Sequence, residues 1–188
     1  MSAPDSNEAR VAAGEPPFDA DIQASLDAVM QGLPPLRLFA TLARDRRLFF
    51  KFFRGALLDQ GHLTPRQREI VIDRTTALCG AEYEWGVHVA AFAGVADLSR
   101  EQITSLTFGG VADDCWDDQA RALIDLCDAL HATATVDDDL WARVAEHFSD
   151  EAIIELLLLA GFYHSTSFLV NGLALPLEEG MPRFEDYR

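Results

Sequence analysis

The sequence is poor in positive charge, and above all in lysine. Lysine and arginine together number 15 against 31 aspartates and glutamates, so the formal net charge is −16 with neutral histidines. Lys51 is the single lysine. A surface this negative repels phosphate backbones and anionic lipid headgroups. We therefore expect neither nucleic acid nor a membrane surface as a partner.

Long apolar runs are also lacking. The strongest one, 156–163, has eight residues, whereas a membrane-spanning helix needs about 20. The first residues, 1–17, are small and polar, contain no apolar signal core and end in a proline pair. These features predict a cytoplasmic protein with a disordered tail over 1–17 and a single domain over 18–188.

Cysteine is scarce and shows no motif. Cys79, Cys115 and Cys127 are an odd number and form no CxxC pair. In a reducing compartment such residues are expected to be free thiols, mostly buried. A fold that depends on disulfides is therefore excluded.

Strand-type alternation is absent over any useful length, and apolar residues instead recur at helical spacing. The clearest start signal is Thr64-Pro65-Arg66-Gln67, with an N-cap threonine, a proline at the first helical position and a glutamine three residues after the cap. The pattern predicts an all-α fold. Helices are expected over about 19–31, 36–45, 46–60, 65–78, 81–93, 99–108, 117–131, 137–147 and 150–172.

Two long apolar helices open in a similar way, one after Leu63 and one after Phe148. An offset of 86 residues places Glu69 opposite Glu155. This similarity predicts a degenerate two-fold internal repeat with halves at about 18–110 and 111–180. The alternative is that two amphipathic helical hairpins look alike by chance.

The densest polar cluster in the chain surrounds Glu84 and His88. Four residues apart on a helix, these two side chains share a face, and a carboxylate beside an imidazole favours the charged ring and orients it. Such a pair can transfer protons near neutral pH. Glu69, on the preceding predicted helix and followed by apolar residues, is a third candidate. An exposed Glu–His pair with little energetic effect is the competing interpretation.

The residues around this pair are aromatic or small, which is typical of a helix packed in a crowded, partly apolar site. Tyr83 and Trp85 are therefore candidate substrate-binding residues. A metal site is the alternative chemistry for the cluster. The chain contains no HxxxH or HExxH motif, so its other histidines would have to converge from distant positions. We expect no metal and no cofactor.

These same residues carry a resemblance to a known family. The run from Arg74 to His88 reads R-x-x-A-L-C-G-A-E-Y-E-W-x-x-H and is followed by A-F-A-G-V-x-x-L-S-x-E-Q-I. It resembles the carboxymuconolactone decarboxylase family, which includes the alkylhydroperoxidase AhpD. A later stretch, 155–171, resembles the C-terminal part of longer members. The resemblance implies an AhpD-like helical bundle, and its packing makes His164 and Asn171 further candidates for lining a substrate cavity.

The resemblance also implies roles for single residues. AhpD-type members carry a CxxC pair that ends four residues before a histidine, with a glutamate twelve residues before the first cysteine. Counted back from His88, the cysteine positions hold Ala81 and Glu84, whereas the glutamate position holds Glu69. The proton-handling residues are thus present and both redox sulfurs are absent. Cys79 stands two positions too early to replace them.

The favoured hypothesis is therefore a small-molecule enzyme that uses acid–base chemistry, with Glu69, Glu84 and His88 as catalytic residues. The resemblance implies a decarboxylase, an isomerase or a lactone-acting enzyme. Thiol peroxidase activity through Cys79 and a non-catalytic binding protein are the alternatives.

A homo-oligomer is expected on two grounds. The phenylalanines Phe49, Phe50, Phe52 and Phe53 exceed what one face of a single helix buries. Members of the family also assemble as trimers or larger rings, so a trimer or hexamer, or else a dimer, is implied.

Overall fold

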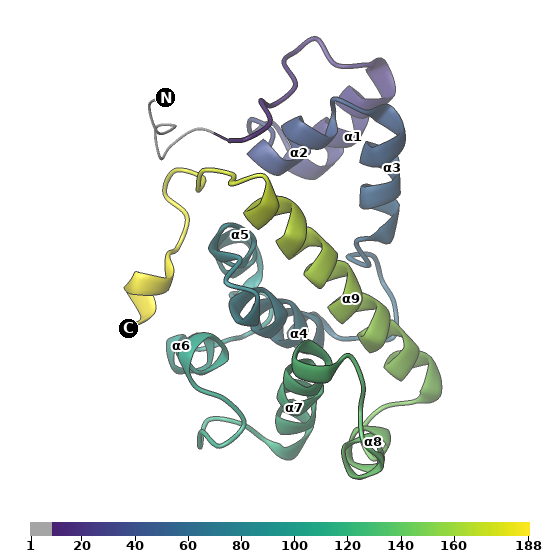
Figure 1. The fold of residues 1–188 in the computed structure, drawn as a ribbon, viewed down its shortest axis with the longest axis vertical. Coiled ribbons are helices and arrows are strands. Elements are labelled where there is room, and N and C mark those ends of the chain that lie inside the picture. The colour runs from purple at the N-terminus through teal and green to yellow at the C-terminus, as the bar shows by residue number, and fades with distance from the viewer. Residues whose placement is uncertain (1–8) are drawn as a thin grey trace.

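The computed structural model describes residues 9–188, and over this range the chain forms helices and no strand (Figure 1). The all-α prediction is confirmed. The elements are α1 (Ala20–Met30), α2 (Arg37–Leu42), α3 (Arg46–Gly55), α4 (Pro65–Leu78), α5 (Glu82–Phe92), α6 (Arg100–Phe108), α7 (Asp118–Thr133), α8 (Asp138–Ala145), α9 (Asp150–Gly172) and the short 3₁₀ helix η1 (Phe184–Tyr187).

Side-chain caps fix the starts of most of these helices. Thr64 accepts a hydrogen bond from the backbone N–H of Gln67, and the Gln67 side chain accepts one from the backbone N–H of Thr64. Ser99 and Gln102 form the same capping box before α6. Because such caps satisfy backbone donors that have no partner within the helix, local sequence alone determines where these helices begin.

Helix α3 and the C-terminus differ from the prediction. The sequence predicted a helix over 46–60, but α3 ends at Gly55, and Leu57 adopts a positive φ of 51° that a helix cannot continue through. The residues that follow reach α9 instead, where the backbone N–H of His62 donates to Oε2 of Glu155 at 2.7 Å. At the C-terminus, η1 has no counterpart among the predicted helices.

Helix α4 lies at the centre of the molecule, with α5, α6, α7 and α9 packed around it (Figure 1). Every residue from Glu69 to Thr76 is buried, polar side chains included. A helix surrounded by others is enclosed on all faces, so any ionisable group on it must find its partners inside the protein. The burial of α4 therefore places the carboxyl groups of Glu69 and Asp73 inside the protein.

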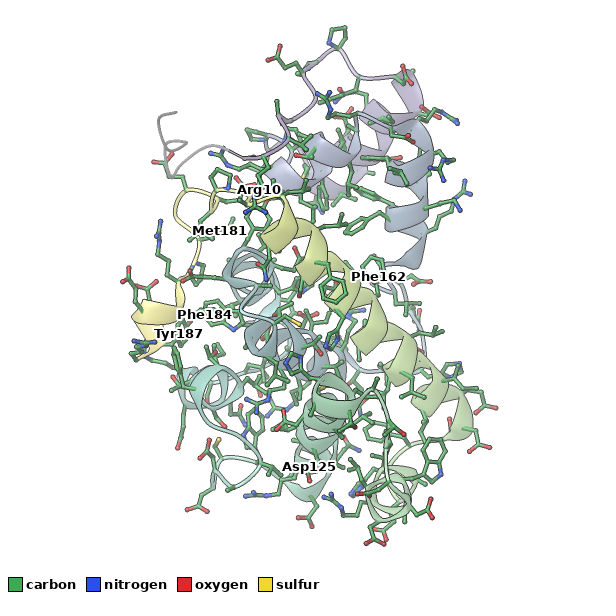
Figure 2. All side chains as sticks on the ribbon, viewed as in Figure 1. Arg10, Asp125, Phe162, Met181, Phe184 and Tyr187 are labelled. Atoms are coloured by element: carbon green, nitrogen blue, oxygen red, sulfur yellow. The ribbon has the colours of Figure 1, made fainter. Side chains whose placement is uncertain are left out.

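Helices α1, α2 and α3 stand at one end of the molecule, beside α9 (Figure 1). Their own small core contains Ile22, Leu26 and Phe49. Phe49 stacks on Phe53 with ring centroids 4.3 Å apart, and Phe52 lies 5.0 Å from Phe162, a residue of α9 that Figure 2 labels. Most of the phenylalanine surface on α3 is therefore used within the chain, which removes the argument that these residues gave for oligomerisation.

The segment after α9 returns along α5 toward α6, where Phe184 and Tyr187 lie at the C-terminal end (Figure 2). The backbone N–H of Phe184 donates to a carboxylate oxygen of Glu82 at 2.7 Å. The backbone of Pro182 crosses directly over Gly86. The last residues of the chain thus form one wall of the α5 environment.

The predicted disordered tail falls in two parts. Residues 1–8 lie outside the described residues. Residues 9–17 form a coil that is attached to the helical body, because the N–H of Arg10 donates to the carbonyl of Leu173 and that of Gly14 to the carbonyl of Ala40. The disorder of residues 9–17 stays a prediction, and these two backbone hydrogen bonds are contacts that the sequence does not reveal.

The internal repeat remains a prediction. Helix α4 ends before Cys79 and gives way to α5, whereas α9 continues without a break through 23 residues. Helix α9 is also the one helix in the described range whose length and composition would suffice to cross a membrane, which is weak evidence by itself. Here it packs against α4 as a core helix.

Candidate active site

His88, on α5, is buried and faces α4. Its Nδ1 lies 2.8 Å from Oε2 of Glu69, which is itself buried on α4. These two predicted catalytic residues therefore meet across the interface of the two helices. The hydrogen bond fixes the orientation of the ring and directs the other nitrogen outward.

That other nitrogen, Nε2, has two neighbours. Oε1 of Glu84 lies 3.6 Å away on the same helix, beyond hydrogen-bond length, and Oη of Tyr163 lies 3.1 Å away on α9. The sequence assigned the orienting role to Glu84. The structure corrects this, because Glu69 makes the direct bond and Glu84 stands beside the reactive nitrogen. Tyr163 was not predicted, and nothing local in its apolar helix distinguishes it.

His88 is positively charged at neutral pH. Burial opposes the charge, but the hydrogen bond to Glu69 and the nearby carboxylate of Glu84 outweigh it and raise the pKa of His88 to about 10. Both ring nitrogens then carry protons, so Nδ1–H donates to Glu69 and Nε2–H donates to Tyr163. The ring holds a proton that it can deliver from Nε2.

A further carboxyl lies behind this group. Asp73 is one helical turn after Glu69 and is buried, and neither of its oxygens has a hydrogen-bond partner among the described residues. Burial, together with the negative charge of Glu69, raises the pKa of Asp73 well above its ordinary value. Asp73 was not predicted as a site residue, although two acids at i, i+4 spacing in an apolar helix were the available sequence signal.

A cavity of about 700 Å³ opens in front of His88. Glu84, His88 and Tyr163 lie on its wall, whereas Glu69 and Asp73 lie behind it. The remaining lining residues are largely apolar and come mainly from α1, α3, α5 and α9. The lining comprises Val29, Met30, Leu33, Leu36, Phe39, Phe52, Phe53, Arg54, Ala56, Leu57, Leu58, Asp59, Glu84, Val87, His88, Ala90, Ala91, Phe92, Phe162, Tyr163 and Met181.

Two charged residues of this lining were not anticipated, namely Arg54 at the end of α3 and Asp59 shortly after it. Both stand where the cavity meets solvent. Arg54 brings a second positive charge to the cavity besides His88. A guanidinium at this position can bind a carboxylate or another anionic group.

Tyr83 and Trp85, which were predicted to bind substrate, do not line the cavity. The hydroxyl of Tyr83 donates to Glu178 at 2.6 Å and accepts from the backbone N–H of Leu38 at 3.1 Å. Trp85 is buried and packs against Phe184, 4.9 Å between centroids. Tyr83 and Trp85 lie about 100° to either side of Glu84 around the helix, and their contacts support the fold around the site.

His164 and Asn171 also lie outside the cavity lining. The Asn171 side chain donates to the carbonyl of Cys79 at 2.9 Å, and Nε2 of His164 lies 3.1 Å from Nδ1 of His131. They belong to a second cluster, which joins Cys79, His131 and His164. We expected no metal site because distant residues would have to converge. In the structure, Cys79, His131 and His164 do converge.

Residues 46–126, from α3 into α7, match the family model described as the carboxymuconolactone decarboxylase family. This match covers less than half of the chain and shows that these residues are similar to that family. The segment includes Glu69, Glu84 and His88, whereas Tyr163 lies outside it. No curated protein matches the chain.

Solved structures show the same fold. One is described as an alkylhydroperoxidase AhpD core, an uncharacterized peroxidase-related protein from Ralstonia eutropha JMP134, with a TM-score of 0.80, 20% identity and coverage of 91% of this chain and 93% of that one. An uncharacterized peroxidase-related protein from Silicibacter sp. TM1040 gives a TM-score of 0.81, 16% identity and coverage of 97% and 100%. The AhpD-like fold is thereby confirmed.

A third similar structure is a variant of the debrominase Bmp8 in complex with 2,3,4-tribromopyrrole, with a TM-score of 0.75, 16% identity and coverage of 90% and 91%. Identities this low establish the fold and not the reaction. Together with the family match over residues 46–126, these neighbours assign the chain an AhpD-like fold.

Proposed function

We propose that this protein is a small-molecule enzyme that works by proton transfer, with His88 as the proton donor. The observation that carries the proposal is the arrangement of the His88 ring. Glu69 holds one nitrogen at 2.8 Å from behind, and the other nitrogen meets Tyr163 and Glu84 on the wall of a largely apolar cavity. Decarboxylation, isomerisation and lactone opening can each use a proton donor in this position.

Decarboxylation illustrates the chemistry. When a substrate carboxylate leaves as CO₂, the electron pair of the broken carbon–carbon bond remains on the substrate as an enolate-like carbanion. Transfer of the Nε2 proton of His88 to that carbon forms the new carbon–hydrogen bond. The ring becomes neutral and stays hydrogen-bonded to Glu69, and a proton from solvent restores it. Apolar walls favour the step because the charge of the carboxylate is lost.

The cavity supports a substrate class. A volume of about 700 Å³ is ordinary for a small organic ligand. Its walls favour an apolar ring, and Arg54 at the open end favours an anionic group on that ring. The debrominase Bmp8, similar in fold, is described in complex with a small halogenated ring. We infer an unsaturated or aromatic ring compound that carries a carboxylate or carbonyl group.

The test is turnover of a panel of ring carboxylates, enol acids and lactones, followed by NMR in D₂O, which detects both CO₂ loss and deuterium incorporation. For an accepted substrate, His88→Gln should lower kcat by about 100-fold or more, as expected for loss of an acid catalyst. The matched control His147→Gln, in an exposed position outside the cavity lining, should turn over at the wild-type rate. Equal rates for His88→Gln and wild type would rule out the proposal.

A peroxidase-like role for Cys79 is the second candidate. It is favoured by the contact between Cys79 Sγ and Nδ1 of His131 at 3.8 Å. Against it, burial raises the pKa of the Cys79 thiol, and Cys115 and Cys127 are free thiols that do not belong to its cluster. A peroxidatic cysteine needs a lowered pKa and a partner that resolves it. Peroxide consumption that disappears in Cys79→Ser would favour this candidate.

A non-catalytic binding protein would use the same cavity without chemistry. The opening of the Glu84–His88 region onto that cavity supports a small-molecule role in either case. Binding of panel compounds without any turnover, at equal affinity in wild type and His88→Gln, would favour the binding role over the enzyme.

A further inference from the structure

Three potential metal ligands from three different helices meet at one point. Cys79 caps the C-terminal end of α4, His131 lies in the last turn of α7, and His164 lies in the second half of α9. Their donor atoms all lie within 4.8 Å of one another. In sequence these residues are separated by 52 and 33 positions, so only the packing of α4, α7 and α9 brings them together.

The tautomer of His164 is fixed by its surroundings. Its Nδ1–H donates to the carbonyl oxygen of Ala160 at 2.9 Å, which leaves the lone pair of Nε2 directed at Nδ1 of His131. Histidines that bind metals typically donate their other ring N–H to a carbonyl or carboxylate in this way. Asn171 holds the backbone of Cys79 through a 2.9 Å hydrogen bond to its carbonyl.

The spacing of the donors matches a tetrahedral ion. Zinc bonds of about 2.3 Å to sulfur and about 2.0 Å to nitrogen imply edges of about 3.5 Å between sulfur and nitrogen and about 3.3 Å between nitrogens. The observed separations are 3.8 Å between Cys79 Sγ and His131 Nδ1 and 3.1 Å between His131 Nδ1 and His164 Nε2. We propose that Cys79, His131 and His164 bind a divalent transition-metal ion of the Zn²⁺ class.

Access and charge agree with this assignment. His131 is exposed and the other two residues are half-buried, so an ion can enter from solvent and keep a water in its fourth position. The strongly negative chain attracts cations. On binding, the Cys79 thiol loses its proton to solvent, and the proton on Nδ1 of His131 moves to the exposed Nε2. One proton is therefore released for each ion bound.

This site is independent of the proton-transfer site. None of its three residues lines the cavity in front of His88. An ion held here would join the ends of α4 and α7 to α9 and would stabilise the native state by mass action. Metal binding and turnover can thus be tested separately.

The first test is titration of the untagged full chain with Co²⁺ and then Zn²⁺. We expect one Co²⁺ per chain, visible-range bands of tetrahedral intensity, and a near-ultraviolet charge-transfer band that reports a thiolate ligand. Zn²⁺ should displace the Co²⁺. Cys79→Ser should lose the charge-transfer band, and His131→Gln and His164→Gln should each weaken binding at least 10-fold. A charge-transfer band that survives in Cys79→Ser, or the absence of this band in the wild-type protein, would overturn the proposal.

Matched controls and a second measurement separate the site from unspecific binding. Cys115→Ser, another half-buried thiol, and His147→Gln should bind Co²⁺ like the wild type. Zn²⁺ should raise the Tm of the wild type, and a chelator should reverse this rise. If Cys79→Ser folds and shows the same Zn²⁺-dependent rise in Tm, the ion binds elsewhere and the proposal is wrong.

Discussion

A buried imidazole is reactive only through the groups that hold it, and His88 is held by groups from three helices. Glu69 compensates the positive ring from behind, Tyr163 meets the free nitrogen, and Glu84 lies close to that nitrogen without bonding it. Removing any one of these groups changes the charge or the orientation of the ring.

The raised pKa of His88 links folding to pH. Because the ring is protonated in the native state up to about pH 10 and in the unfolded chain only to about pH 6.5, the native state binds one more proton in this window. The stabilisation is complete below the unfolded pKa and is lost as the pH rises. We expect the free energy of unfolding to fall by up to about 1.4 kcal/mol per pH unit. Urea denaturation between about pH 7 and about pH 8.5, below the ordinary thiol pKa, measures it.

The control for this pH effect is His88→Gln, which cannot titrate. Its unfolding free energy should change less over the same range. If the two proteins have parallel profiles, His88 is not charged in the native state.

Asp73 should destabilise the protein at neutral pH. Because the pKa of Asp73 is raised, the native state either keeps a proton on this carboxyl or buries its negative charge. In the unfolded chain the carboxylate is ionised and surrounded by water. The contribution is unfavourable above the unfolded pKa of about 3.9 and disappears below it. Asp73→Asn is expected to be more stable than wild type by about 1 to 3 kcal/mol at pH 7.

The same pair of proteins supplies its own control for Asp73. The difference in unfolding free energy should shrink as the pH falls toward about 4, where the unfolded aspartate is also protonated. If Asp73→Asn is less stable than wild type at pH 7, Asp73 is ionised in the native state and stabilises the charge of His88.

Among the elements, α5 depends on the segment that crosses it. Gly86 lies beneath the carbonyl of Pro182, and a Cβ at this position would stand 2.5 Å from that oxygen. A glycine inside a helix normally costs stability relative to alanine. Here it allows the C-terminal segment to approach α5, and Glu82 and Trp85 fix that segment in place.

Gly86→Ala should therefore destabilise the protein by about 1 to 3 kcal/mol, as overpacking does, although alanine is the better helix former. Hydrogen exchange at the amides of 181–187 should increase in the variant. Gly172→Ala, at the end of α9 with nothing within 4 Å of the added carbon, is the matched control and should lose no stability. Unchanged exchange and stability in Gly86→Ala would contradict the close approach.

For the whole molecule, the expected homo-oligomer now rests on a different surface. Phe49 and Phe53 are used inside the chain, whereas Ile154, Leu158 and Phe168 on α9 are 59%, 59% and 70% exposed. Their spacing places them along one face of the helix. Exposed apolar rows of this kind are typical of protein interfaces.

We predict that this face of α9 forms the contact between copies. Leu158→Glu should lower the molar mass measured by light scattering to that of a single chain, because a carboxylate is costly to bury at an interface. The matched control is Val95→Glu, which changes a residue that is 70% exposed outside α9, and it should leave the assembly intact. A wild-type protein that is already a single chain would refute the prediction.

The sequence alone predicted the features that depend on residues a few positions apart. The capping box of Thr64 and Gln67 placed the start of α4, the lack of alternation established the helical class, and spacing together with the family resemblance singled out Glu69, Glu84 and His88. These signals depend on residues a few positions apart, and backbone hydrogen bonding converts them directly into structure.

Which of these residues touch one another depended on the packing of the helices. Glu69 rather than Glu84 bonds the ring because α4 and α5 cross at that point, and Tyr163 arrives from 75 positions away. The end of α3 at Gly55, and the position of Tyr83 and Trp85 outside the cavity lining, could not be predicted for the same reason. Side-chain partners across helices are set by how the helices pack, and a single sequence records helical faces but not the distances between them.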